Sequence, residues 1–303
     1  ALSPAAARAA RWASKLNVPL FLVEEALPDR GRRLERAVRW LGERLWGAYV
    51  RRRASQVIAL DAAARIQAEE EGFDPKRIHI LPGGVDLGHY RPNLTSPLPT
   101  QHGIRGRILL HLGRLDHGRG LEVLVEAFAH TVGRRDGWTL VMAGTGPAAY
   151  PLRAQASRLG VGARLCWLRT PREEELPGLL AASTLLVSPS LAEDVSGWRV
   201  RRALACGLPV LAGRGSRSEE FVEHDGCGLL IDKQEETAWE EALTIATGSP
   251  ERRRRWGVAA RERAEERYAW PTIVKDFETL MLGELRQSDP GDHEADPATG
   301  PVV

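Results

Sequence analysis

Short apolar runs alternate along the chain with segments long enough to form amphipathic helices, and no other sequence feature restricts the fold as much. Parallel strands joined by crossover helices produce this alternation. We therefore predict an α/β fold. The expected strands form two series, residues 19–23, 56–60 and 77–81, followed by residues 107–112, 139–143, 164–168, 185–188, 209–212 and 228–231.

The two series are separated by a stretch rich in proline and glycine, which is typical of an interdomain linker. We predict a partial N-terminal domain with its linker over residues 1–97 and a second domain with closing helices over residues 98–285. Six strands complete a Rossmann-like sheet, whereas three do not, so the first domain is expected to be incomplete. Residues 286–303 hold few apolar side chains and are predicted to be disordered. Asp61 is placed to cap the helix that follows the second strand.

Charge and composition exclude several classes of function. The 42 Lys and Arg nearly balance the 40 Asp and Glu, so no whole-molecule field selects nucleic acid as a partner. The three cysteines form no CxxC pair and the histidines no HxxxH pair, so neither a disulfide framework nor a metal site is expected. No uncharged apolar run approaches the roughly 18 residues that cross a bilayer. A cytoplasmic protein without metal or cofactor is predicted.

Residues 113–120, with the sequence GRLDHGRG, follow a predicted strand and open a predicted helix. Glycines let backbone approach a ligand, and a helix N-terminus offers free N–H groups. Arg114 and Arg119 are spaced to grip a diphosphate from two sides. A solvated basic turn fits the same residues. Gly144 and Gly146, after the next strand, lie at the same predicted sheet edge, where either a nucleotide-binding loop or a plain tight turn is consistent.

Taken together, the motifs resemble those of family 4 glycosyltransferases in order and spacing. This resemblance implies a GT-B fold, with a complete C-terminal Rossmann-like domain and an incomplete N-terminal one. It also implies retaining transfer of a sugar from a nucleotide diphosphate sugar, with Arg114 and Arg119 neutralising the departing diphosphate and usually without a metal. The matching segments are ILPGGVD at 80–86, GRL and RG within 113–120, AGTGP at 143–147, ELP and PS within 175–190, ALACGLPV at 203–210, EFVEH at 220–224 and ERYAW at 266–270.

Several positions depart from the family pattern. The family carries two glutamates eight positions apart; the second is replaced here by Arg202, and the first corresponds to Asp194, or to Glu193 if one residue has been inserted. The expected catalytic residues are therefore Arg114, Arg119, Asp194 and Glu193. The expected donor-binding residues are Gly113, Gly144, Gly146, Gly197, Arg202, Ser216 and Glu220.

The N-terminal part departs further. Glu25 stands where the family has an active-site histidine, and strands that normally precede residue 19 are expected upstream or on another chain. The arginine-rich segment from Arg30 to Arg53 carries an apolar stripe, which fits either an anionic membrane surface or a helix packed on the domain. The acceptor is expected to be a glycan or a lipid-linked molecule. Two alternatives stay open: a non-catalytic partner that kept the fold, and an NDP-sugar epimerase, for which no pair of acid and base carboxylates is evident.

Overall fold

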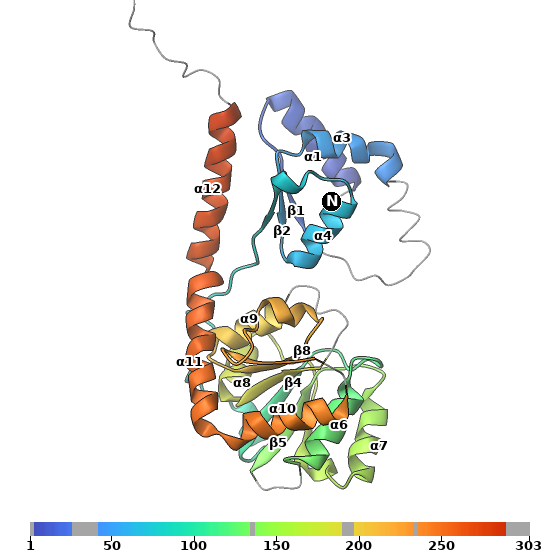
Figure 1. Ribbon diagram of the computed structural model, residues 1–303, viewed down its shortest axis with the longest axis vertical. Helices are drawn as coiled ribbons and strands as arrows, with labels where there is room; N and C mark the ends of the chain where they lie inside the picture. The colour runs from blue at the N-terminus through green and yellow to red at the C-terminus, as the bar shows by residue number, and fades with distance from the viewer. Residues whose placement is uncertain (1–2, 26–41, 134–136, 190–196, 233–234, 289–303) are drawn as a thin grey trace, which may run out of the picture.

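A computed structural model describes residues 3–25, 42–133, 137–189, 197–232 and 235–288. It contains two parallel sheets, one in each half of the molecule (Figure 1). The α/β prediction is confirmed, and each predicted strand is present with ends within two residues of the expected ones. The first sheet has the order β1 (Phe21–Glu24), β2 (Gln56–Ala59) and β3 (Ile78–Ile80); the second has the order β6 (Leu165–Leu168), β5 (Trp138–Ala143), β4 (Arg107–Leu112), β7 (Leu185–Ser188), β8 (Val210–Gly213) and β9 (Gly228–Ile231).

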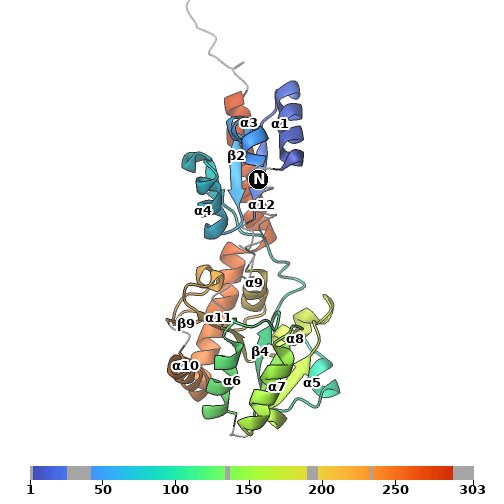
Figure 2. The ribbon, with the colours of Figure 1, turned by 90° about the vertical axis from the view of Figure 1, so that its right-hand side faces the viewer.

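Helices cover both faces of the second sheet, as a fully parallel sheet requires (Figures 1 and 2). Successive side chains of β4 point to opposite faces, so Ile108 and Leu110 enter one apolar core and Leu109 enters the other. The first core is closed by α5 (Leu98–Gln101), α8 (Leu176–Ala182), α9 (Trp198–Ala205) and α11 (Pro250–Arg267), and the second by α6 (Leu121–His130), α7 (Ala149–Arg158) and α10 (Glu236–Gly248).

The strand order of the second sheet reverses at β4. This strand pairs with β5 on one side and with β7 on the other, in register Leu109 to Leu185. The connections that leave the carboxyl ends of β4 and β7 therefore diverge to opposite faces of the sheet. Such a switch point leaves a crevice at the carboxyl edge, where open α/β sheets bind their ligands.

The first sheet is smaller and has one apolar core. The strands pack against α1 (Pro4–Leu16), α3 (Ala48–Arg53) and α4 (Ala62–Glu70), with the π-helical turn η1 (Glu43–Gly47) leading into α3 (Figure 2). Asp61 has extended backbone angles, and its carboxylate accepts a hydrogen bond from the Ala64 N–H at 2.7 Å. The predicted N-cap is therefore confirmed.

The two halves are joined by the linker and by the last helices. The Val85 N–H donates to the Tyr268 carbonyl at 2.7 Å, so the linker crosses the start of α12 (Trp270–Ser288). α12 then runs along the first sheet (Figure 1), where the rings of Phe277 and Phe21 meet edge to face at 5.9 Å. Gln56 also hydrogen-bonds Glu284. Because α12 reaches Ser288, residues 286–288 are helical, although the disordered tail was predicted to start at 286.

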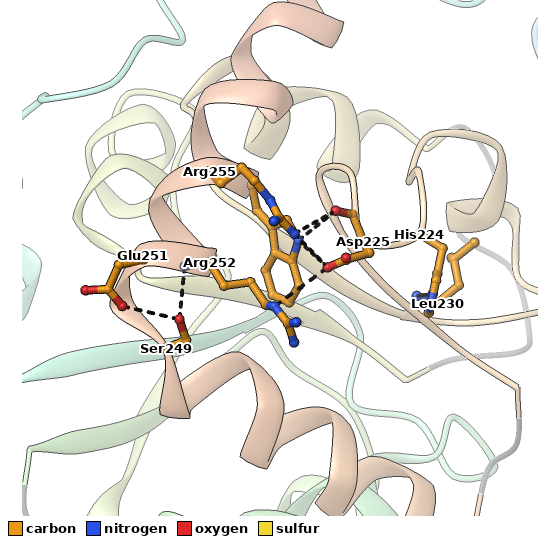
Figure 3. A network of polar contacts seen from close by, with 8 residues as sticks. His224, Asp225, Leu230, Ser249, Glu251, Arg252 and Arg255 are labelled. Atoms are coloured by element: carbon orange, nitrogen blue, oxygen red, sulfur yellow. Dashed lines mark hydrogen bonds and ion pairs between the residues drawn. The ribbon is translucent and has the colours of Figure 1, made fainter.

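The EFVEH segment has a structural role beside β9. His224 Nδ1 accepts from the Leu230 N–H at 3.1 Å, and the Asp225 carboxylate accepts from Arg255 at 3.1 Å (Figure 3). Ser249 caps α11 through the Arg252 N–H. The contact of Asp225, which directly follows EFVEH, fastens α11 to the connection between β8 and β9. The His224 contact holds that connection against β9. The remaining short helices are η2 (Pro75–Arg77), η3 (Gly162–Arg164) and η4 (Arg217–Glu220).

Candidate functional site

A pocket lies at the switch point, between the carboxyl ends of β4 and β7. It brings together Gly113, Arg114, Arg119 and Ser216 from the predicted site, although Ser216 is distant in sequence from the other three. Their roles in donor binding or catalysis stay predictions. None of the described lining residues is acidic. The lining consists of His111, Leu112, Gly113, Arg114, Arg119, Leu186, Val187, Ser188, Arg199, Val200, Ser216 and Ser218.

Arg114 and Arg119 converge on one carboxylate. Arg114 donates to Asp116 through Nε and Nη2 at 2.8 and 3.0 Å, and Nε of Arg119 lies 3.4 Å from the same side chain. Asp116 raises the pKa of the exposed Arg114, chiefly through their hydrogen bond. Asp116 therefore contacts both guanidinium groups and orients them on the same side of the turn.

Gly144 and Gly146 serve the packing between two loops. A Cβ on Gly144 would lie 1.7 Å from the Gly113 oxygen, and one on Gly146 would lie 2.2 Å from the Leu115 oxygen. The loops also exchange backbone bonds, with the Leu115 N–H donating to the Thr145 carbonyl at 3.0 Å. Close contact between backbones therefore accounts for this GxG without a dinucleotide. Direct donor contact by either glycine stays a prediction.

Among the lining residues that the sequence did not indicate, two have titratable side chains. His111 is 5% exposed, and Arg199 projects from the first turn of α9. Burial, Arg199 and Arg119 together lower the pKa of His111 to about 4, so its imidazole is neutral at pH 7. The sequence did contain a signal for His111, because this histidine interrupts the aliphatic run of β4. Nothing near Arg199 in sequence indicated that it would reach the same pocket.

Arg202, a predicted donor-binding residue, contacts the linker and not the pocket. Its guanidinium stacks over the rings of Tyr90 and Trp198 at 4.9 and 4.6 Å and pairs with Glu173 at 2.8 Å. The Tyr90 hydroxyl donates to the same carboxylate at 2.8 Å, and burial and this bond raise the pKa of Tyr90. Arg202 therefore ties the linker to α9 and does not line the pocket. A role of Arg202 in donor binding stays a prediction.

Glu220 also lies outside the pocket lining. Both of its carboxylate oxygens accept from the Ala62 N–H, at 3.0 and 3.1 Å, at the start of α4 in the other half of the molecule. Gly197 begins α9 with φ of 56°, and a Cβ there would lie 1.9 Å from the buried Phe221 ring. Glu193 and Asp194 lie outside the described residues. Glu25 is exposed at the end of β1.

One group of described side chains has metal-ligand character. His130 Nδ1 lies 2.6 Å from Glu236 and 2.9 Å from Glu240, at the far end of α6 from the arginine-lined turn. These ion pairs connect α6 with α10. The expectation that the reaction needs no metal or cofactor stays a prediction. Within the described ranges, none of the helices combines the length and the apolarity that a bilayer-spanning segment needs.

Comparison with known proteins shows that the chain is similar to glycosyltransferases. The chain resembles Anabaena HepE, solved with UDP and, separately, with UDP-glucose; with the UDP form the TM-score is 0.77 at 23% identity, covering 92% of this chain and 76% of HepE. It is 28% identical to a D-inositol 3-phosphate glycosyltransferase of Segniliparus rotundus over 219 residues, which are 70% of this chain and 48% of the relative. It is also 29% identical to a GDP-mannose-dependent alpha-(1-6)-phosphatidylinositol monomannoside mannosyltransferase of Mycolicibacterium smegmatis, covering 69% and 57%.

The molecule has two parallel α/β units, and the larger one has the six-stranded sheet of a complete Rossmann-like domain. This arrangement is the GT-B fold of glycosyltransferases. Residues 99–263 match the model of the glycosyl transferases group 1, and the chain belongs to this family. The resemblance drawn from the motifs is confirmed at this level. The chain spans about half the length of the curated relatives it matches.

Proposed function

We propose that this chain holds the donor for a retaining glycosyltransferase, which moves a sugar from a nucleotide diphosphate sugar to a glycan or lipid-linked acceptor. One observation carries the proposal: Arg114, Arg119 and Arg199 line a pocket at the switch point of the second sheet, and none of its described lining residues is acidic. A diphosphate in this pocket would meet guanidinium groups from two elements. Those groups would stabilise the charge that develops on the leaving diphosphate as the sugar departs, without requiring a cation.

Calorimetric titration of UDP, GDP, UDP-glucose and GDP-mannose tests the donor site. These probes follow from the ligands and donors named for the similar proteins. We expect at least one diphosphate to bind. Replacement Arg119→Ala should weaken binding by roughly 10- to 100-fold, because it removes a charge-assisted contact worth about 1.5–3 kcal/mol.

Arg158→Ala is the matched control, since Arg158 ends α7 and does not line the pocket. It should leave every affinity unchanged. If none of the four ligands binds the wild-type chain, or if both variants lose affinity equally, the donor-site proposal fails. Transfer activity itself is then assayed with the bound nucleotide sugar; binding without transfer would favour the alternative of a non-catalytic partner.

We further propose that the protein works in the cytoplasm at an anionic membrane surface, through α1. This helix carries Arg8, Arg11 and Lys15 and no acidic residue, and Trp12 and Leu16 are 63% and 65% exposed. Basic residues beside exposed aromatic and aliphatic groups suit the headgroup region of a membrane. Residues 30–41 of the basic segment expected to make this contact lie outside the described residues.

Co-sedimentation with vesicles of anionic or neutral lipid tests the membrane contact. We expect binding to anionic vesicles only, and its loss in Trp12→Ala combined with Arg11→Glu. Tyr150→Ala is the control, because Tyr150 is 81% exposed but lies on α7. Equal binding of the α1 variant and the wild type would reject this surface.

A further inference from the structure

His111 is a polar side chain with one unused nitrogen. Its Nδ1 lies 3.2 Å from the Val187 carbonyl oxygen, and a carbonyl only accepts, so Nδ1 carries the proton in the neutral ring. Nε2 then presents a lone pair. It is buried, and within the described part of the chain no group meets it with hydrogen-bond geometry. The backbone of Arg114 lies near enough to the ring to oppose, with Val187, the fall in its pKa.

The space beside Gly113 explains what Nε2 is placed to meet. A Cβ built on Gly113 would lie 3.6 Å from His111 Nε2 and 3.7 Å from Cζ of Arg199. Without a side chain at Gly113, the gap in front of its Cα stays open to a ligand. An oxygen atom packed against that Cα would face both the imidazole and the guanidinium.

The charges around the gap favour an anionic oxygen. Arg199 contributes from α9, and Arg114 and Arg119 contribute from the turn after β4, where Asp116 binds both. Among the described lining residues, the other polar side chains besides His111 are the hydroxyls of Ser188 on β7 and of Ser216 and Ser218 at η4. A phosphate oxygen suits the arginines but only accepts hydrogen bonds, so it would be repelled by the bare lone pair of Nε2.

We infer that His111 takes up one proton from water when a nucleotide sugar binds, and that its imidazolium then donates from Nε2 to a phosphate oxygen of the diphosphate. This inference rests on the proposed donor function. It assigns to His111 a direct contact with the ligand, in addition to the arginines. It also makes the chain's affinity for its donor depend on pH through a residue of the β-sheet itself.

The direction of the pH effect follows from the surroundings of the ring. In the free protein, burial and the positive charges of Arg199 and Arg119 hold the pKa of His111 down at about 4. A bound diphosphate opposes those charges and accepts from the ring, so the pKa is higher in the complex. Affinity must therefore increase as the pH falls through the pKa of the complex, and level off near the pKa of the free protein. For one proton the increase is limited to about tenfold per pH unit.

Nucleotide sugars are the right probes because both ends of their diphosphate are esterified. The free terminal phosphate of UDP or GDP titrates near pH 6 and would obscure the effect, since a phosphate monoester has a second pKa of about 6. UDP-glucose and GDP-mannose are titrated into the full chain from about pH 8 to about pH 5.5, in pairs of buffers with different ionisation enthalpies. The difference in heat between paired buffers gives the number of protons taken up.

We expect proton uptake that rises toward one, and an affinity gain of about threefold or more, as the pH falls over this range. His111→Asn keeps an amide N–H near the position of Nδ1 and places nothing at Nε2, so uptake and the gain should both disappear. His117→Asn is the matched control: His117 belongs to the same turn, is 60% exposed and lies 3.7 Å from Glu122. This variant should behave like the wild type.

Each outcome separates the two proposals. If neither nucleotide sugar binds the wild-type chain at any pH, the donor function fails and this inference fails with it. If one binds without proton uptake, or if uptake persists in His111→Asn, the donor function stands and the role of His111 is rejected. Should His111→Asn not fold, His111→Phe provides the second variant, and the buffer dependence of the wild type remains decisive by itself.

Discussion

The two sheets are built from the same kind of strand but differ in how completely their own helices cover them. Every aliphatic side chain of β4–β9 is at most 8% exposed, whereas Val23 of β1 is 63% exposed and Ile80 of β3 is 41% exposed. Among the described residues, the second sheet has an apolar core on each face, whereas the first has one small core and is also contacted by α12. Stability is therefore expected to be concentrated in the half that carries the pocket, and the other half depends on α12.

The largest loss of unfolding free energy is expected for a substitution in the core of the second sheet. Trp239 on α10 is fully buried in the second sheet's core, so Trp239→Ala should cost about 3–5 kcal/mol of unfolding free energy. The same substitution at Trp12 in the first half should change stability by no more than about 0.5 kcal/mol, because that side chain is mostly exposed. Urea unfolding of the two variants, monitored by hydrogen exchange, measures how much unfolding free energy each substitution costs. Equal costs would contradict the difference between the halves.

A smaller effect is expected where α12 covers the first sheet. Phe277→Ala removes the edge-to-face contact with Phe21 and should destabilise the first half by about 1–3 kcal/mol. Faster amide exchange should appear in β1 and β2, with β4–β9 unchanged. Leu282→Ala on the same helix is the control, since Leu282 is 55% exposed. If exchange accelerates equally in both sheets, the first half does not depend on α12 in the manner described.

The smallest effect concerns the contact between the halves. Glu220→Gln weakens the bonds from the Ala62 N–H and should cost about 1 kcal/mol, close to the loss of a helix cap. Exchange should increase in the first turn of α4. Glu223→Gln serves as the control, because Glu223 is in the same segment with its side chain 67% exposed. An unchanged rate at Ala62 and Ala64 would show that Glu220 does not hold the halves together.

Sequence patterns predicted the strands of the fold more completely than they predicted the contacts of the site residues. β4, β7 and β9 occur at the predicted residues because apolar side chains end abruptly at glycine, serine or charged neighbours. The convergence of Arg114 and Arg119 was also predictable, since both belong to one turn. Local spacing could not reveal that Glu220 contacts a residue 158 positions away, or that Arg202 stacks between Tyr90 and Trp198. Such destinations depend on tertiary packing, and a guanidinium has several favourable partners.

The gap between prediction and structure is clearest at His111. An apolar run with one histidine was interpreted as a strand, and this was correct. Its buried Nε2 becomes visible only once Val187 of the neighbouring strand occupies Nδ1. Functional atoms on a strand are thus defined by pairing with other strands, which the sequence of a single strand does not contain.

The proposed position of the diphosphate pocket, at the switch point of the second sheet, can be tested by hydrogen exchange with and without saturating UDP-glucose or GDP-mannose. Exchange should become slower at residues 113–120 and in the first turn of α9, with β1–β3 unaffected. Protection confined to the first sheet, or absent from residues 113–120 while a nucleotide sugar is bound, would contradict it.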